Sequence, residues 1–248
     1  MTIALVQQSS VGTMSGSLSG TASLSGVTAG NALICLATHI ASDATNPTFS
    51  VVDSQTGTPN YTQDVLVRQA SNSAAMCTSL FSALAGSHTV TVTALAGAAG
   101  NSFGKLILLE ISGITTFDKF GTLALTGTAA VTSSTGTLSA ANEILFAVLG
   151  AQSALTGFTT PPTGGPGVFT NLFSDPSTFD SNMNYQIQTT GTAAVTANWG
   201  TLNSSAALAG LVATYYKPAV VTPLPYTPYS PTQFFVNENV IQLPGRNR

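Results

Sequence analysis

Short apolar or alternating runs, separated every few residues by turn-forming residues, limit this chain to a fold made of strands. Residues 89–93 and 185–189 alternate with a period of two, as strands with one buried face do. Residues 32–37, 105–111, 143–149 and 208–216 are almost continuously apolar, which predicts strands buried on both faces. Further strands are predicted at residues 3–8, 49–53, 61–68, 76–84, 129–135 and 193–199. Clusters of Gly, Asn, Asp, Ser and Pro separate these runs, and the pattern predicts an all-β, antiparallel sandwich or barrel.

Helical alternatives fit this sequence poorly. Residues 94–99 are rich in alanine, but glycine interrupts them and they are too short to stand as a helix. A coiled coil would need about half Ala, Glu, Lys, Leu and Arg at helical spacing. Charged residues make up only 6% of the 248 residues here. Solubility must therefore rest largely on hydroxyl groups, which 37 Thr and 27 Ser provide.

The few charges argue against nucleic-acid and membrane partners. The six basic residues are scattered and the formal net charge is −3, whereas binding to nucleic acid or to an anionic membrane needs clustered Lys and Arg. A membrane-spanning helix needs about 20 apolar residues, and the best run, at 106–109, ends at Glu110. Residues 1–8 lack a basic stretch and turn polar early, so a secretory signal peptide is not expected.

Two cysteines, Cys35 and Cys77, are too few for a disulfide framework. Each lies in an apolar run, which favours two buried free thiols, although a single bridge between neighbouring strands stays open. His39 follows Cys35 by four residues, which on a strand separates the two by about 13 Å. Neither a Cys–His pair nor a zinc site is expected from this spacing, and no metal or cofactor is predicted.

The one catalytic motif is a weak match. Residues 100–104 fit the Gly-x-Ser-x-Gly pattern around Ser102, but that site needs a helix after the serine and a histidine later in the chain. Both histidines, His39 and His88, precede Ser102. The segment is therefore predicted as a glycine-rich hairpin turn.

Three carboxylates were candidates for acid–base chemistry, and structural roles are favoured for each. Glu110 shares a strand face with Leu106 and Leu108, so it is expected to be partly buried with a raised pKa. It is expected to accept a hydrogen bond from a hydroxyl group of a neighbouring strand or from a lysine. Glu143 begins a strand and is expected to be an edge charge. Asp53 is expected to cap its own turn rather than to bind calcium. The protein is thus predicted not to be an enzyme.

Two other features are predicted to be structural. Trp199, the only tryptophan, is expected in the core, with a sugar-stacking role as the alternative. The loop at 159–167 is predicted as an outward tip without chemistry. The hexapeptide GTAAVT occurs at 127–132 and again at 191–196, either by chance in a biased composition or because the two copies occupy related strands.

The composition changes after residue 216. Residues 217–248 contain six of the twelve prolines, which predicts an extended segment that cannot pack as a central strand. An apolar, strand-capable stretch follows and could add to a sheet edge of a neighbouring molecule, or fold back on its own domain. The residues predicted to bind a partner are Phe234, Phe235, Val236, Val240, Ile241 and Leu243.

The order of these pieces resembles the jelly-roll or concanavalin-like β-sandwich domains of phage virion proteins and bacterial surface proteins. The matching pieces are GNALI at 30–34, VVDS at 51–54, NYT at 60–62, TVTVT at 89–93, LLEISGI at 108–114 and ANEIL at 141–145. The family's turn, D-S-x-G-N-x-Y, is altered here to DSQTGTPNY at 53–61. The resemblance spans residues 1–216 and implies a jelly-roll-like β-sandwich there. The arm at 217–248 is predicted from its composition. It transfers no functional residue, because the shared pattern marks turns and core.

What the resemblance implies is a binding or structural role. The favoured hypothesis is a non-enzymatic virion protein, a phage capsid decoration or minor capsid protein assembled in the host cytoplasm. Its partners would be copies of itself, with a trimer as one candidate, and other virion proteins such as the major capsid protein. The alternative is a tail-fibre or spike module that binds a host cell-surface glycan. A glycoside hydrolase or lyase on the same fold would need two carboxylates facing one cleft.

Overall fold

The computed structural model describes residues 2–16, 18–41, 48–55, 61–69, 73–94, 102–126, 130–152, 158–165, 167–175, 180–201 and 207–219. The chain divides into a unit at Met1–Pro218 and a unit at Ala219–Arg248. Within the described ranges the backbone forms antiparallel strands and turns and no helix, so the predicted all-β sandwich is confirmed. The predicted arm residues, Phe234 to Leu243, lie outside these ranges.

The first half of the chain forms two sheets. The first large sheet has the order β1-β9-β4-β7-β6, and β2 also pairs with β9. Its strands are β1 (Ala4–Gln8), β2 (Gly12–Ser15), β4 (Ala32–Ala41), β6 (Thr62–Gln69), β7 (Ser73–Leu80) and β9 (Ser102–Ser112). The first small sheet has the order β3-β8-β5, with β3 at Ser19–Val27, β5 at Phe49–Asp53 and β8 at Gly86–Ala94.

The second half also forms a large and a small sheet. The second large sheet has the order β10-β17-β12-β15-β14, and the second small sheet has the order β11-β16-β13. The large-sheet strands are β10 (Thr116–Thr126), β12 (Glu143–Ala151), β14 (Thr170–Asp175), β15 (Asp180–Gln188) and β17 (Ala207–Tyr216). The small-sheet strands are β11 (Ala130–Ser134), β13 (Phe158–Thr163) and β16 (Thr196–Thr201).

The two halves share one topology. We number the strands of each half from one to eight, with β1 and β2 counted together as the first strand. In both halves the order of strands in the large sheet is then 1-8-3-6-5, and the order in the small sheet is 2-7-4. Each half is therefore a jelly roll, a double sheet in which the chain passes back and forth between the layers, except that the fifth and sixth strands are neighbours in the large sheet. Both halves also have a glycine on the first strand where the backbone of the second strand approaches closely. A Cβ added at Gly12 would collide with the carbonyl oxygen of Thr21, and one added at Gly121 would collide with that of Ser134.

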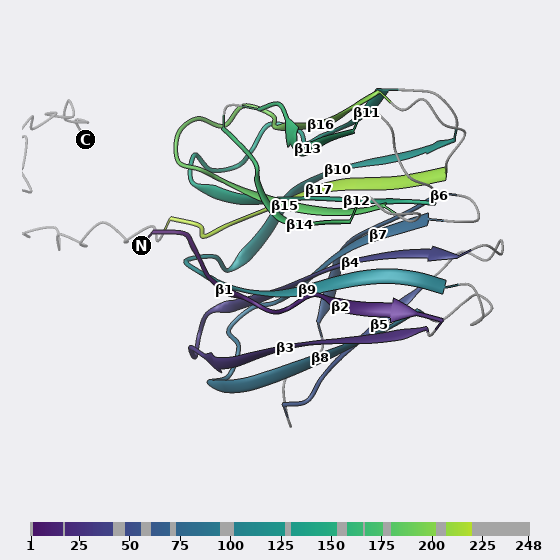
Figure 1. The fold of residues 1–248 in the computed structure, drawn as a ribbon. Helices are drawn as coiled ribbons and strands as arrows, with labels where there is room; N and C mark the ends of the chain where they lie inside the picture. Colours follow the sequence, from purple (N-terminus) through teal and green to yellow (C-terminus); the bar gives the residue numbers. More distant parts are fainter. Residues whose placement is uncertain are drawn as a thin grey trace, which may run out of the picture. The chain divides into compact units, whose positions relative to one another are not determined.

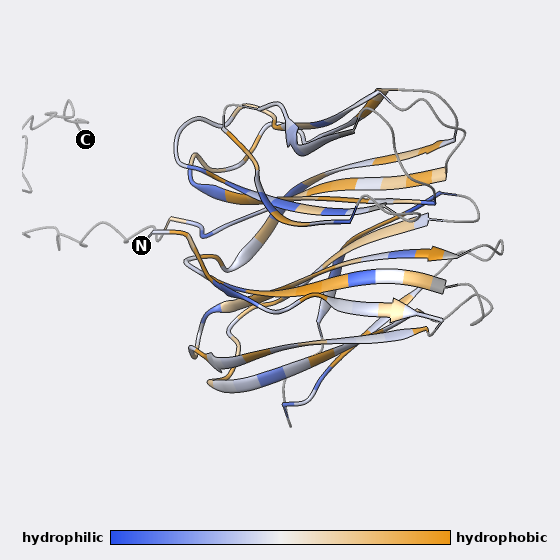
Figure 2. Ribbon diagram, viewed as in Figure 1, coloured by the Kyte–Doolittle hydropathy of each residue, from blue (hydrophilic) through white to orange (hydrophobic). Residues whose placement is uncertain are grey.

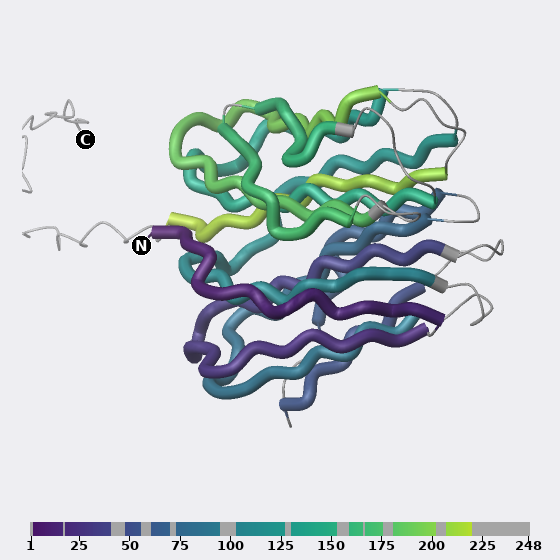
Figure 3. Tube along the Cα trace, viewed as in Figure 1, coloured from purple at the N-terminus to yellow at the C-terminus, as the bar shows by residue number. Residues whose placement is uncertain are grey.

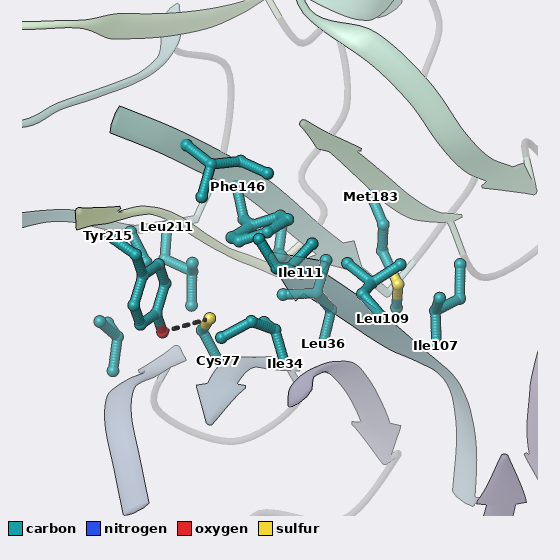
Figure 4. Close-up of a cluster of buried hydrophobic side chains, with 14 of the residues drawn as sticks. Ile34, Leu36, Cys77, Ile107, Leu109, Ile111, Phe146, Met183, Leu211 and Tyr215 are labelled. Carbon is teal, nitrogen blue, oxygen red and sulfur yellow. Dashed lines mark hydrogen bonds between the residues drawn. The ribbon is translucent and has the colours of Figure 1, made fainter. Parts of the chain in front are cut away.

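The four sheets stack as layers, with the two large sheets inside and the two small sheets outside (Figure 1). One core lies within each jelly roll and a third lies between the two large sheets. Figure 3 shows the chain completing one pair of layers before it begins the other. The central core contains aliphatic side chains and the aromatic rings of Phe146 and Tyr215 (Figure 4).

This layering explains the continuous apolar runs of the sequence. Strands of the large sheets have a core on both faces, and β7, β12 and β17 are buried over nearly their whole length. Figure 2 shows the resulting apolar stretches on β9 and β17. Strands of the small sheets have one buried face, so β8 alternates as predicted. The prediction of a hairpin turn at 100–104 is wrong for residues 102–104, because β9 begins at Ser102 and pairs there with Ala41.

Candidate functional site

The outer face of the first small sheet is a flat array of hydroxyl groups. Thr89, Thr91 and Thr93 point outward from β8, since the residues between them are buried. Thr21 of β3 is the register partner of Thr91. Across the β3–β8 pair, Ser19 and Thr93 join their hydroxyls at 2.8 Å, and Ser23 and Thr89 join theirs at 2.9 Å. The remaining outward residues are Ser25, Ser50, Val52 and Ser87. We call this set the first hydroxyl face.

The second small sheet has an outer face of the same chemistry. Thr196 on β16 donates its hydroxyl proton to Ser134 on β11 at 3.0 Å. These are the strands that correspond to β8 and β3 in the first jelly roll. Other outward residues are Ala130, Thr132, Thr163, Asn198 and Thr201. We call this set the second hydroxyl face, and neither face includes a charged residue.

The charged side chains in the described ranges lie outside the two hydroxyl faces and interact with other groups of the protein. Lys105 pairs with Asp175 at 3.3 Å, and Lys119 lies 3.7 Å from Asp118. Arg68 and Lys217 also interact with other groups. The part of the surface formed by the small sheets is therefore polar and neutral.

Glu110 is fully buried and stabilises the loop between β3 and β4. Its carboxylate accepts hydrogen bonds from Gln7 Nε2 at 2.6 Å, the Thr28 backbone N–H at 2.9 Å and Asn31 Nδ2 at 2.6 Å. Burial alone would raise its pKa, but these three donors outweigh burial and lower it. The prediction of a raised pKa is therefore wrong. The structural role as an acceptor is confirmed, but the donors are two carboxamides and a backbone N–H rather than the predicted hydroxyl or lysine.

Glu143 begins β12 as predicted but is fully buried between paired strands, so its assignment as an edge charge is wrong. Its Oε1 accepts the Ala140 backbone N–H at 2.9 Å, and its Oε2 has no hydrogen-bond partner. Asp118 lies nearby and accepts the Ser139 backbone N–H at 2.8 Å and the Ser139 hydroxyl at 2.5 Å. The two carboxyls thus stabilise the loop between β11 and β12, which corresponds to the loop at Glu110.

The carboxyl pair has opposed protonation tendencies. Burial and the nearby Asp118 charge raise the pKa of Glu143 to about 7, despite the hydrogen bonds from Ala140 and Thr214. For Asp118, burial is outweighed by the Ser139 hydrogen bonds and the Lys119 charge, which lower its pKa. A protonated Glu143 beside an ionised Asp118 is therefore the stable state at mildly acidic pH.

Replacing Glu143 with glutamine is expected to stabilise the fold by about 1–2 kcal/mol near pH 8 and to change little near pH 4.5. Between its ordinary pKa of 4.5 and the folded value of about 7, Glu143 ionises in the unfolded chain but not in the folded one. The wild-type protein therefore loses stability as the pH rises through this window. Urea unfolding at both pH values measures the difference. An equal gain at both values would show that ionisation is not the cause.

Asp53 caps its own turn, as predicted, by accepting the Gln55 backbone N–H at 3.1 Å. It also makes a buried ion pair that was not predicted: His88 Nδ1 lies 2.8 Å from Asp53 Oδ2, and Tyr61 donates its hydroxyl proton to the same oxygen at 3.1 Å. His88 Nε2 faces the Leu84 carbonyl oxygen at 2.9 Å. Both ring nitrogens thus lie within hydrogen-bonding distance of an oxygen, and these contacts join β5 to β8.

The thiols are free, as favoured from the sequence, and both are buried. Cys35 and Cys77 lie on neighbouring strands but face different cores, so they do not bridge. Burial raises the pKa of Cys35 to about 12 and that of Cys77 well above its ordinary value. Cys77 Sγ lies 3.0 Å from the Tyr215 hydroxyl, which donates to Asp64 at 2.7 Å (Figure 4). A protonated, buried thiol is a poor nucleophile, so this chain of groups is structural.

Two further predictions have mixed outcomes. Trp199 is fully buried, which confirms its core role. The outward tip predicted at 159–167 is wrong for its first part, because Phe158–Thr163 is β13. Gly164 and Gly165, which follow, are exposed, and Gly167 lies against the side chain of Gln186.

Sequence reasoning missed a row of four carboxamides on β15, formed by Asn182, Asn184, Gln186 and Gln188. All are buried, and several of their polar atoms have no hydrogen-bond partner. Alternation at 185–189 indicated a strand but not that its polar face would point into the protein. The sequence does contain a signal for this row, because Asn or Gln occupies every second position from 182 to 188.

Other candidate chemistry is not assembled within the described ranges. The structure describes the backbone of Ser102 but not its side chain. The residues predicted to bind a partner, from Phe234 to Leu243, lie outside the described ranges. No group of three or more His, Cys, Asp or Glu residues there could hold a metal ion. Among the same residues, no helix is long and apolar enough to cross a bilayer.

Comparison with protein-family models, with curated protein sequences and with solved structures finds no match to this chain.

Proposed function

We propose that this protein is a non-enzymatic structural component of a phage virion, a decoration or minor capsid protein. It docks onto sister copies and onto other virion proteins, such as the major capsid protein, through its two hydroxyl faces. The segment at 217–248, with its apolar stretch after the prolines, is proposed as a second contact. Oligomers, with a trimer as one candidate, would form by the same faces.

The observation that carries the proposal is the chemistry of the two hydroxyl faces. Interface cores are depleted in charged residues, because burying a charge without a partner is costly. Serine and threonine are short, so ordering them at an interface loses less side-chain entropy than ordering lysine or glutamate. Several hydroxyls on these faces are already paired across strands, which fixes their positions before docking.

The buried carboxylates support a structural role over an enzymatic one. Glu110, Glu143 and Asp118 each hold a loop through backbone or side-chain N–H groups. A glycosidase would instead hold two carboxyls apart across a substrate-sized space. The carboxyl groups of Asp118 and Glu143 lie close enough for the Asp118 charge to raise the pKa of Glu143, and both side chains are largely enclosed.

The test is a pair of lysine substitutions at the centre of the first hydroxyl face. Thr21→Lys with Thr91→Lys places two like charges on register partners, which is expected to weaken self-association of the full chain by at least about 100-fold. Sedimentation velocity over a concentration series measures this. Thr190→Lys, at an exposed turn outside both faces, is the matched control. Unchanged association of the double variant would contradict docking through this face.

A further inference from the structure

We infer that the interior of the second jelly roll contains a binding site for a neutral saccharide, built on the row of carboxamides along β15. This site is independent of the proposed assembly faces, because it lies between the second large and second small sheets. It gives a specific location to the recognition of a glycan by this protein.

The four amides face the inside of the second jelly roll. Met183, between Asn182 and Asn184, belongs to the core between the large sheets, so its neighbours point the opposite way. Trp199, on β16 of the second small sheet, donates its indole N–H to Asn182 Oδ1 at 3.1 Å. Asn184 Nδ2 donates to the same oxygen. The exposed fractions of the four residues are 0%, 0%, 2% and 4% in chain order.

Much of the hydrogen-bonding capacity of this row is unused. Gln186 has no partner for either its Nε2 or its Oε1. Asn182 Nδ2, Asn184 Oδ1 and Gln188 Oε1 also have none. A buried polar atom without a partner destabilises a fold by about 1–3 kcal/mol. Several such atoms in one row indicate groups that are kept for something other than stability.

The first jelly roll shows that the fold does not require these amides. Its corresponding strand, β7, occupies the same place in the strand order. The residues of β7 that face the first small sheet are Ala74, Met76, Thr78 and Leu80. Three are apolar, and Thr78 donates its hydroxyl proton to the Cys35 carbonyl oxygen at 3.4 Å. The sixth strand therefore presents mainly apolar side chains to the small sheet in the first half and carboxamides in the second half.

The row continues toward the edge of its sheet. On the edge strand β14, Asn171 is the register partner of Asn184 and is exposed, and Ser174 is the partner of Asn182 and is half-buried. Register partners share a face, so polar groups extend from the interior to the edge. At the other side, Gly167 has no Cβ, and one added there would collide with the amide of Gln186.

The chemistry of the row selects a neutral, hydroxyl-rich ligand. Each carboxamide offers donors and acceptors without charge, which matches hydroxyl groups that both donate and accept. An anionic ligand would lack a counter-charge, because the cation on the adjoining layer, Lys105, already pairs with Asp175. Trp199 supplies an apolar ring beside the amides, and small-molecule sites combine such a ring with a few placed polar groups.

Trp199 also provides the readout, since it is the only tryptophan in the chain. The full chain is titrated separately with D-glucose, D-galactose and N-acetyl-D-glucosamine while tryptophan emission is recorded. We expect a saturable change with at least one of these sugars. Gln186→Met, which copies the residue type of Met76, is expected to weaken the response at least about tenfold and to raise the Tm, because it removes unpartnered atoms.

Two variants separate binding from folding. Met76→Leu in the first jelly roll is the matched control and should leave the sugar response unchanged. Gly167→Ala displaces the Gln186 amide and should weaken binding while the fold is retained. A flat titration with all three sugars, or an undiminished response in Gln186→Met, would overturn the inference and assign the amides to buried water. Self-association is measured without sugar, so failure here is distinguishable from failure of the assembly proposal.

Discussion

Replacing His88 with alanine is expected to lower the free energy of unfolding by about 3–5 kcal/mol, which is the effect of removing one partner of a buried ion pair. The variant leaves Asp53 buried with only the Tyr61 hydroxyl and the Gln55 backbone N–H as donors. It also leaves the Leu84 carbonyl oxygen without the donor that His88 Nε2 provides at 2.9 Å. Urea unfolding followed by circular dichroism measures the loss.

A double-mutant cycle separates the pair from the packing of the ring. The double variant Asp53→Asn with His88→Gln replaces both members of the pair with neutral groups. Its loss in free energy of unfolding should be smaller than the summed losses of the two single variants, Asp53→Asn and His88→Gln. Additive losses would mean that Asp53 and His88 stabilise the sheet independently. Thr89→Ser, on the outer face of the same strand, should stay within about 0.5 kcal/mol of wild type.

Replacing Glu110 with alanine is expected to destabilise the fold by about 2–3 kcal/mol at neutral pH. The change removes the acceptor for three donors, from Gln7, Thr28 and Asn31, and hydrogen bonds to a charged group are stronger than neutral ones. Water can reach some of these donors after the change, because Thr28 is exposed. The loss should therefore be smaller than for His88.

The contribution of Glu110 depends on pH in the opposite sense to that of Glu143. Its pKa is lowered in the folded state, so its stabilisation is present above its ordinary pKa of 4.5 and is lost as the pH falls through the folded value. The difference between wild type and Glu110→Ala should thus shrink in acid. A difference that stays constant from about pH 7 to about pH 3 would show that the carboxylate charge contributes nothing.

The strands of the inner layers could be predicted because their apolar runs are continuous. Residues 143–149 and 208–216 lie within β12 and β17. The sequence gives weaker signals for β3 and β10, which were not predicted as strands. In β3, buried and exposed residues alternate, but the residues on both faces are mostly small. Their hydropathies therefore differ little, and the alternation is hard to see in the sequence. In β10, Asp118 and Lys119 interrupt the apolar pattern at a register shift.

The duplication could not be predicted, because the halves share strand order without sharing residues. β4 begins with Ala32 and β12 begins with Glu143 at the same place in the topology. The two GTAAVT copies do not mark the duplication either: Val131 lies on β11 and Val195 directly precedes β16, and these strands pair within one small sheet.

The roles of buried polar groups depend on partners that are distant in sequence. Glu110 was correctly placed on a buried face, but the direction of its pKa shift is set by Gln7, Thr28 and Asn31. The amides of β15 were visible as an alternating pattern. Both faces of β15 are covered, because it belongs to an inner layer, and only the layering decides which side chains turn inward.

Cryo-electron microscopy of purified phage particles that contain this protein tests the assembly role most directly. We expect density for the paired jelly rolls on the particle, with at least one hydroxyl face buried against a capsid protein or a sister copy. A reconstruction in which both hydroxyl faces are open to solvent would contradict the assembly role.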